Sequence, residues 1–308
     1  MGSKVLVSVV INCLNGAPYL AEAIDSVYAQ TFSDYEIVFW DNASTDNTDK
    51  IAQSYDHNLR YFRAEKTTPL GAARNLALQQ CEGEYVAFLD CDDIWEPQHL
   101  ERLLEGFTDD RIGLTYTDRL NVLNDRDHPI CRISETVKPA SGDVFYDILP
   151  GVYINPSMAM VRRSVLDDVG CFDESYDFVE EAELFLRIAR KYWFGYIDEP
   201  LTVYRYHEGN LSNRFISQQA ETLRFRAELL ERYPDIRERL PNLEQEWMFN
   251  FHARNLRWYA GSRDYLRATS ALLSVTWQGV RTPGYAWERL KAFLSRLTGK
   301  AQTADWLG

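Results

Sequence analysis

Short apolar runs and amphipathic segments alternate along the first hundred residues. The runs Val5–Ile11, Glu36–Trp40 and Leu59–Arg63, with a fourth ending at Asp90, predict β-strands. The segments between them predict helices over Pro18–Gln30, Asp49–Tyr55 and Leu70–Gln80. Because strands alternate with helices, we expect an α/β fold with a mostly parallel sheet flanked by helices.

The pattern continues less regularly to about residue 206. It predicts a helix over Pro97–Gly106, strands over Gly113–Tyr116 and Asn155–Val161, and two short extended pieces within Tyr196–Tyr206. Residues 119–141 are polar and rich in turn formers, which predicts a hairpin or a mobile loop over a site. A helix is expected near Glu180 and Glu181, where acids in a first turn ordinarily serve the helix dipole.

From Phe215 onward the pattern predicts helices without strands. We therefore expect an α/β domain over residues 1–214 and an all-helical C-terminal region over residues 215–308. The last helix carries Arg289, Lys291, Arg296 and Lys300 beside an apolar face. Such a helix would pack on its own domain, lie on an anionic membrane or join a second copy of the chain.

The fourth strand ends in three carboxylates, Asp90, Asp92 and Asp93, around Cys91. Three acids this close repel one another, and a hard divalent cation with oxygen ligands would compensate their charge. The ordinary alternative is that Asp92 or Asp93 caps the helix that starts near Pro97.

Polar residues also follow the other strands of the predicted sheet. Asn12 and Asn15 follow the first strand and Asp41 follows the second. Ligands of open α/β sheets bind at the carboxyl ends of the strands, so these residues and Asp90 predict one shared site.

Composition limits the partners and the compartment. A net charge of -13 argues against nucleic acid as a partner, but an acidic protein can hold a nucleotide diphosphate through a metal. Five cysteines without regular spacing indicate a reducing compartment and no disulfide framework. No apolar stretch is long enough for a signal peptide or a spanning helix, so we expect a cytoplasmic protein, with peripheral contact at the inner face of the membrane as one role of the C-terminal helices.

In this order, several motifs resemble those of glycosyltransferase family 2, the inverting nucleotide-sugar transferases with the GT-A fold. They are Val9–Asn15, Asp41-Asn42-Ala43-Ser44-Thr45-Asp46, Gly71–Asn75 with Ala73-Arg74-Asn75, Asp90-Cys91-Asp92, Gly170–Asp173, Glu180-Glu181 and Tyr204–His207. The resemblance covers about the first two thirds of the chain, which makes residues 1–214 the expected GT-A catalytic domain. A fixed order of motifs is far more specific than any one of them.

The resemblance implies a donor site for a nucleotide diphosphate sugar, a UDP- or dTDP-sugar. Asp41 would accept a hydrogen bond from the base, and Arg74 would face the base or diphosphate. Asp92 would hold Mn²⁺ or Mg²⁺, and Asp90 would hold the ribose or the metal's water shell. Asn12, Cys13, Asn15 and Cys91 complete the expected nucleotide-binding set.

The resemblance also implies a general base that deprotonates the acceptor hydroxyl. Glu181 stands where the family usually has aspartate after a glutamate, and Glu180 is its rival for the role. His207 would reach the diphosphate or the metal, or else be structural.

The resemblance implies a hexosyltransferase acting on a glycan, lipid-linked or protein acceptor in bacterial surface polysaccharide, O-antigen or glycoconjugate assembly. One rival function is a sugar nucleotidyltransferase, which typically grips a triphosphate with a basic, glycine-rich loop. Residues 12–17 offer one glycine and no lysine or arginine. The other rival is a catalytically silent binding module, whose signature would be the loss of the metal or base carboxylates.

Overall fold

The structure, a computed structural model, describes residues 5–55, 58–210 and 215–261, together with residues 267, 270, 271, 273 and 274. Contacts divide the chain into two units, Met1–Thr222 and Leu223–Gly308. Among these described residues no helix is long and apolar enough to cross a membrane.

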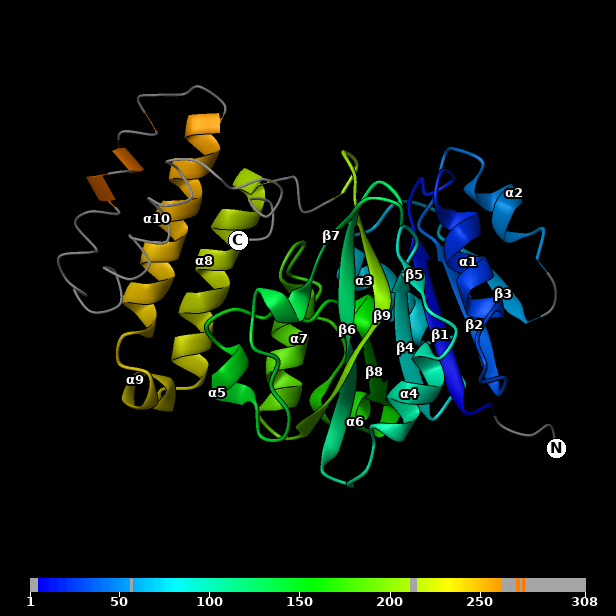
Figure 1. The fold of residues 1–308 in the computed structure, drawn as a ribbon, viewed down its shortest axis with the longest axis horizontal. Coiled ribbons are helices and arrows are strands. Elements are labelled where there is room, and N and C mark those ends of the chain that lie inside the picture. The colour runs from blue at the N-terminus through cyan, green and yellow to red at the C-terminus, as the bar shows by residue number, and fades with distance from the viewer. Residues whose placement is uncertain are drawn as a thin grey trace. The chain divides into compact units, whose positions relative to one another are not determined.

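The first unit opens with four parallel strands, as predicted (Figure 1). They lie in the order β3-β2-β1-β4, so β1 is central and is buried along its whole length, as expected for a parallel strand covered on both faces. Their bounds are β1 Val7–Cys13, β2 Tyr35–Asp41, β3 Leu59–Arg63 and β4 Tyr85–Asp90. The helices that join them are α1 Leu20–Tyr28, α2 Thr48–Ala52 and α3 Leu70–Leu78.

The sheet continues beyond β4 with strands of mixed direction, in the full order β3-β2-β1-β4-β8-β6-β9-β5. β8 is antiparallel to both β4 and β6, β6 is parallel to β9, and β5 and β7 pair antiparallel with β9 and β6. The bounds are β5 Ile94–Trp95, β6 Ile112–Leu123, β7 Pro129–Arg132, β8 Ala159–Arg162 and β9 Trp193–Tyr206.

Three predictions in this half need correction. The strand expected at Gly113–Tyr116 continues to Leu123, and pairing with β7 makes the hairpin that was one of two alternatives for residues 119–141. The two extended pieces expected within Tyr196–Tyr206 are one strand, β9, because β6 pairs with it along most of its length. The strand expected at Asn155 begins only at Ala159, because Pro156 opens a 3₁₀ turn there.

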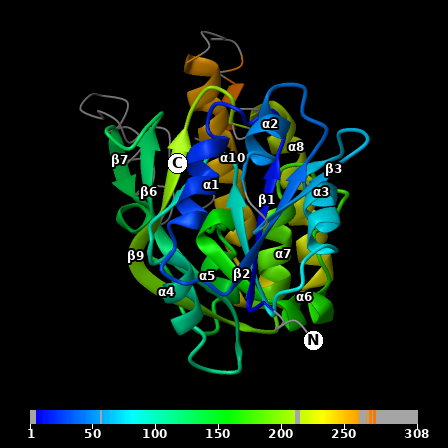
Figure 2. The same ribbon diagram turned by 90° about the vertical axis from the view of Figure 1, so that its right-hand side faces the viewer.

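Helices cover both faces of the sheet (Figure 2). α1, α2 and α4 (His99–Glu105) pack on one face, while α3 packs on β1 and β2 from the other. α6 (Arg163–Val169) contacts β8 and α7 (Glu180–Ala189), which in turn contacts β9. The remaining short elements are η1 Ile133–Glu135, α5 Phe145–Ile148 and η2 Pro156–Met158.

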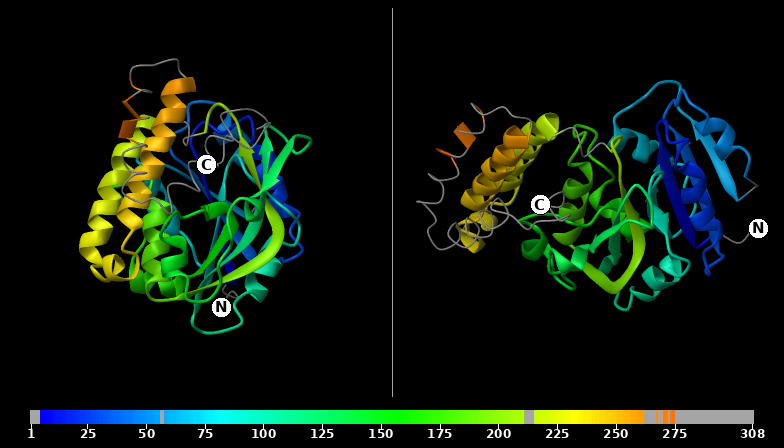
Figure 3. Two further views of the ribbon diagram at one scale, coloured as in Figure 1. Left: turned by 60° about the vertical axis from the view of Figure 1, so that its left-hand side comes forward. Right: turned by 45° about the horizontal axis from the view of Figure 1, so that its top comes forward.

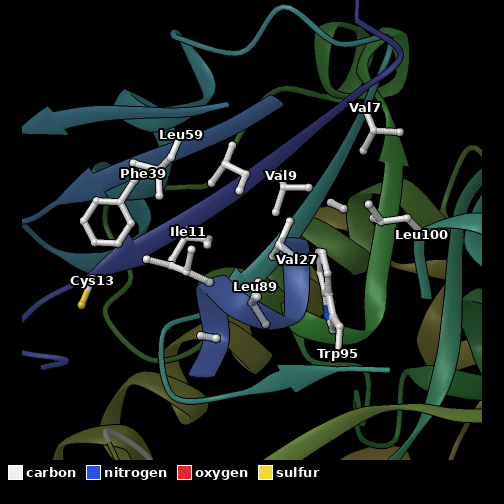
Figure 4. Packing of buried hydrophobic residues seen from close by; sticks show 14 of the residues in the cluster. Val7, Val9, Ile11, Cys13, Val27, Phe39, Leu59, Leu89, Trp95 and Leu100 are labelled. Carbon is white, nitrogen blue, oxygen red and sulfur yellow. The ribbon is translucent and has the colours of Figure 1, made fainter. Parts of the chain in front are cut away.

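The core on the α1 face explains why the strand ends are fixed (Figure 4). Val7, Val9, Ile11 and Cys13 alternate along β1 and all point into this core, which they share with α1 and with Trp95. Burying such side chains stabilises the fold by about 1.5–3 kcal/mol each, so the register of β1 is strongly set. The last residues of β1, β2 and β4 are therefore held at defined positions.

The second unit contains helices without strands in its described residues, in keeping with the predicted helical C-terminal region. α8 (Phe215–Arg232) begins in the first unit, and its part from Leu223 onward lies beside α10 (Leu243–Gly261) (Figure 3). The short α9 (Asp235–Arg239) lies between them in the chain. The Arg226 guanidinium lies 5.0 Å from the centre of the Trp247 ring. The predicted domain boundary at 214/215 stays a prediction, and the basic helix predicted near Arg289 lies outside the described residues.

Candidate active site

The carboxyl ends of β1, β2 and β4 bring four of the predicted residues to one edge of the sheet. Asn12 pairs in register with Asp90, and Cys13 pairs with Asp41. This is the arrangement that the sequence predicted from the polar residues after each strand.

Asp41 is fully buried, and its carboxylate is held by groups of the chain itself. Tyr61 donates its hydroxyl to Oδ2 (2.7 Å), the Ser44 backbone N–H donates to Oδ1 (2.7 Å), and Arg63 forms an ion pair with Oδ2. The Arg63 side chain is 43% exposed, so it is the partner of Asp41 that a ligand could displace.

Asn15 joins the first loop to the second. Its backbone has φ 57°, a left-handed conformation that asparagine tolerates better than most residues. Its Oδ1 accepts the backbone N–H of Thr45 at 2.7 Å, and its own N–H donates to Ser44 Oγ at 2.9 Å. Asn15 therefore shapes the strand-end loops.

Arg74 connects the acids of β4 with those of α7. It is buried, and it donates from Nη1 to Glu180 Oε1 (2.9 Å) and from Nη2 to Asp90 Oδ1 (2.8 Å). Glu181 Oε2 lies 3.9 Å from Nη1. One guanidinium fork thus gathers carboxylates that are up to 107 residues away in the sequence.

The two glutamates of this cluster differ in access. The Glu180 side chain is 3% exposed and tied to Arg74, whereas that of Glu181 is 33% exposed. Burial raises the pKa of Glu180, and Arg74 opposes that rise. Burial and the neighbouring charge of Glu180 raise the pKa of Glu181. Glu183 serves a different purpose, since it forms an ion pair with Arg187 at 2.7 Å on the same helix.

The turn before Glu180 is fixed by Glu221 of α8, a residue that the sequence analysis missed. The backbone N–H groups of Asp177 (2.9 Å), Phe178 (2.6 Å) and Val179 (3.0 Å) all donate to its carboxylate. Val179 is the N-cap residue of α7, and Asp177 and Phe178 directly precede it. Glu221 therefore fixes the N-terminus of α7, and with it the positions of Glu180 and Glu181. Only the long-range fold reveals this role.

Asp92 faces His207. Asp92 Oδ2 lies 2.9 Å from His207 Nε2 and 3.5 Å from Asn210 Nδ2, and the Asp92 side chain is 25% exposed. The ring of Tyr19 packs on that of His207 with 4.5 Å between ring centres.

The donor atoms here fit a divalent cation that shares its shell with a ligand. Among the described residues no three histidine, cysteine or acidic side chains are grouped closely enough to hold a metal by themselves. Asp92 and His207 offer one oxygen and one nitrogen at the surface of the site, and Asp90 precedes Asp92 at the end of β4. A cation bound here would complete its coordination with diphosphate oxygens and water, as Mg²⁺ commonly does.

Asp93 does not cap the following helix, so that alternative is wrong for it. It is buried, and it accepts the Ser157 hydroxyl (2.6 Å) and the Arg205 backbone N–H (3.2 Å). Burial and the charge of Asp92 raise the pKa of Asp93 well above its usual range. α4 begins instead after Gln98 without a side-chain cap, which excludes Asp92 from that role too.

Arg205 is a second residue whose role the sequence did not reveal, although it lies in the Tyr204–His207 motif. Its buried guanidinium donates to the carbonyls of Asp92 (3.0 Å) and Asn124 (2.9 Å) and to the Glu22 carboxylate (2.8 Å). Arg205 therefore orients the turn that carries Asp92. The neighbouring Asp93 accepts a hydrogen bond from the Arg205 backbone N–H. Both the side chain and the backbone of Arg205 thus hold this turn against β9.

Cys13 and Cys91 lie beside each other at the strand ends. Cys13 is buried and Cys91 half-buried, and the sulfurs of both border Gly16. A Cβ atom at Gly16 would collide with the sulfur of Cys13 and lie 2.8 Å from that of Cys91. Only glycine fits this approach of the first loop.

The alternating strands, the polar strand ends and the acidic turn define the nucleotide-sugar transferase fold of the GT-A type. Residues 8–170 match the sequence model of "Glycosyl transferase family 2". The chain belongs to this family and is a glycosyltransferase.

Individual proteins agree with this assignment. The chain is 26% identical over 220 residues to an uncharacterized glycosyltransferase of Rickettsia typhi. The aligned region covers 70% of this chain and 69% of the relative. Residues 1–349 of TarS from S. aureus, solved with UDP-GlcNAc, superpose with a TM-score of 0.59 at 20% identity over 86% of this chain and 90% of that chain. The mannosyltransferase PcManGT from Pyrobaculum calidifontis, solved with GDP-Man and Mn²⁺, gives 0.61 at 18% identity over 94% and 84%. Both confirm the predicted fold.

Proposed function

We propose that this protein is a metal-dependent, inverting hexosyltransferase that moves a sugar from a nucleotide diphosphate donor to an acceptor hydroxyl. The observation that carries the proposal is the Arg74 fork, which places the donor-side Asp90 next to Glu180 and Glu181. A donor and an acceptor bound around this cluster would meet at one place. A nucleotide diphosphate sugar as the donor is supported by two structural neighbours, one solved with UDP-GlcNAc and one with GDP-Man.

On the donor side, the nucleoside would be surrounded by Asn12, Cys13, Asn15 and Asp41. Cys91 would lie near the diphosphate. A base N–H would reach Asp41 Oδ2 by displacing the exposed Arg63, which leaves a negative acceptor suited to uracil or thymine. Arg74 stays bound to Asp90 and orients it. Mn²⁺ or Mg²⁺ held by Asp92, with His207 and Asp90 near it, would neutralise charge on the departing diphosphate.

On the acceptor side, Glu181 is the better candidate for the general base. It is partly exposed, so a hydroxyl can reach it, while Glu180 is buried and already bonded to Arg74. Its raised pKa lies closer to neutral pH, which favours proton transfer from an alcohol. Glu181 takes the proton as the hydroxyl attacks the anomeric carbon from the face opposite the leaving group, so one displacement inverts the configuration. The family resemblance favours an acceptor in surface polysaccharide, O-antigen or glycoconjugate assembly.

The test is to incubate the protein with a panel of UDP-, dTDP- and GDP-sugars and Mn²⁺, and to measure released nucleoside diphosphate. A sugar nucleotidyltransferase would release none, and neither would a silent binding module. Asp92→Ala should abolish release and metal-dependent nucleotide binding. Full turnover of this variant without added metal would contradict the ligand assignment.

A second experiment separates the two glutamates. Glu181→Gln should leave nucleotide affinity intact while transfer stops, because the amide cannot accept the proton. Glu180→Gln keeps an acceptor for Arg74 and should retain transfer. If Glu180→Gln alone stops transfer at unchanged nucleotide affinity, the base is Glu180.

A further inference from the structure

Two of the five cysteines meet at the donor edge of the sheet. Cys13 ends β1, and Cys91 directly follows β4. These strands are parallel neighbours with Asn12 opposite Asp90, and each cysteine is the next residue along its segment. Neighbouring strands lie about 4.8 Å apart, within the separation of about 4.4–6.8 Å between the Cα atoms of disulfide-bonded cysteines.

The side chains of this pair converge as well. Both sulfurs face Gly16, and both residues pack against the same core. The other cysteines have different surroundings. Cys81 bonds to the Ala77 carbonyl, Cys131 contacts Asn121 and Cys171 is exposed. Only Cys13 and Cys91 are thus arranged for a bond between them.

We propose that Cys13 and Cys91 form an oxidation site, at which a peroxide joins the two thiols in a reversible disulfide that weakens donor binding. The half-buried Cys91 meets the peroxide first. Its sulfur attacks one oxygen, the O–O bond breaks, and a sulfenic acid and one water form. The sulfur of Cys13 then displaces the hydroxyl as a second water. Two S–H bonds are lost, one S–S bond forms, and hydrogen peroxide takes up the two electrons and two protons.

The bond would disturb the donor site because of what flanks it. Two separate thiols are replaced by an S–S bond of about 2.05 Å, which draws the two strand ends together. Cys91 stands between Asp90, which is held by Arg74, and Asp92, which faces His207. Both carboxylates must move when Cys91 moves. Cys13 likewise carries the loop at Gly16, whose N–H bonds to Thr48.

Formation of the bond is tested on the full chain without any nucleotide. Reduced protein is treated with hydrogen peroxide and digested without reductant, and its peptides are analysed by mass spectrometry. We expect a linked pair containing Cys13 and Cys91, lighter by two hydrogens than the sum of the free peptides. The link should persist in Cys171→Ser, the matched control at an exposed cysteine. Absence of the link in the folded wild type, or a dominant link to another cysteine, overturns the proposal.

The effect on donor binding rests on the proposed function and is measured separately. UDP affinity in the presence of Mn²⁺ should fall at least about tenfold on oxidation and return with dithiothreitol. In Cys91→Ser and Cys13→Ser the ratio of affinities before and after peroxide should stay near one, whatever their starting affinity. A link that forms while UDP affinity stays constant overturns the coupling. If reduced wild type binds none of the nucleotides tested, the proposed function fails while the peptide result still decides the oxidation site.

Discussion

Replacing Arg74 with methionine should destabilise the first unit strongly, and more at high pH than at low pH. Methionine keeps much of the apolar stem but removes both charge-assisted hydrogen bonds, to Glu180 and to Asp90. Such bonds contribute about 1.5–3 kcal/mol each, and loss of one partner of a buried ion pair costs about 3–5 kcal/mol. We expect a loss of about 3–5 kcal/mol at pH 8.

The pH dependence follows from the carboxylates left behind. Burial already raises the pKa of Glu180 and of Asp90, and Arg74 opposes both rises. Without Arg74 these pKa values rise further, so the folded variant binds more protons than the folded wild type near neutral pH. Because the folded state then gains stability as pH falls, the loss should shrink by up to about 1.4 kcal/mol per pH unit for each carboxylate that takes up a proton.

The assay is urea unfolding followed by tryptophan fluorescence at pH 6 and pH 8. The matched control is Arg126→Met, which removes the exposed ion pair with Glu96 and should cost less than about 1 kcal/mol at either pH. A loss for Arg74→Met that is as small as that of the control, or one that does not change between the two pH values, would refute the reasoning.

Three further predictions concern residues around the site. Glu221→Ala should lower kcat about tenfold or more with little change in the donor KM, because the N-terminus of α7 loses the carboxylate that holds it. Glu221→Gln should recover part of that activity. Equal loss in both variants would contradict a positioning role. The kcat of the wild type should fall as pH decreases through a midpoint above the ordinary glutamate value of about 4.3, because desolvation and the neighbouring charge of Glu180 raise the pKa of Glu181. A midpoint at the ordinary value would exclude Glu181 as the base. Burial lowers the pKa of His99 to about 3, so folding stability from this group is present above pH 6.5 and is lost as pH falls below it. Between pH 7 and pH 5 the wild type should lose about 2 kcal/mol relative to His99→Phe, and a constant difference in the free energy of unfolding would contradict this.

The meeting of polar residues at one edge of the sheet could be predicted from the sequence because it depends on local order. Strand-forming runs that alternate with helices produce parallel strands, and the carboxyl ends of parallel strands meet at one edge. Asn12, Asp41 and Asp90 each follow such a run, so their meeting required no knowledge of register. The structure confirms it through the pairs Asn12–Asp90 and Cys13–Asp41.

The later strands were harder to predict because their pairing is not local. β8 enters antiparallel between β4 and β6, and β9 is continuous because β6 lies beside it. A run of residues such as Tyr196–Tyr206 does not encode the neighbour that extends it. Side-chain packing across strands decides strand length in such cases more than intrinsic preference does.

By itself the sequence determined the α/β fold and the residues gathered at the strand ends, since these follow from patterns read within a few dozen residues. It also determined the family, through the fixed order of motifs along the first two thirds of the chain. Only the tertiary structure decided that Arg74 joins Asp90 to Glu180, that Asp93 is buried against Ser157, and that Glu221 holds the start of α7. Each of these contacts links segments far apart in the chain. Their partners are chosen by the direction of side chains on packed elements, which depends on register and packing across the whole unit.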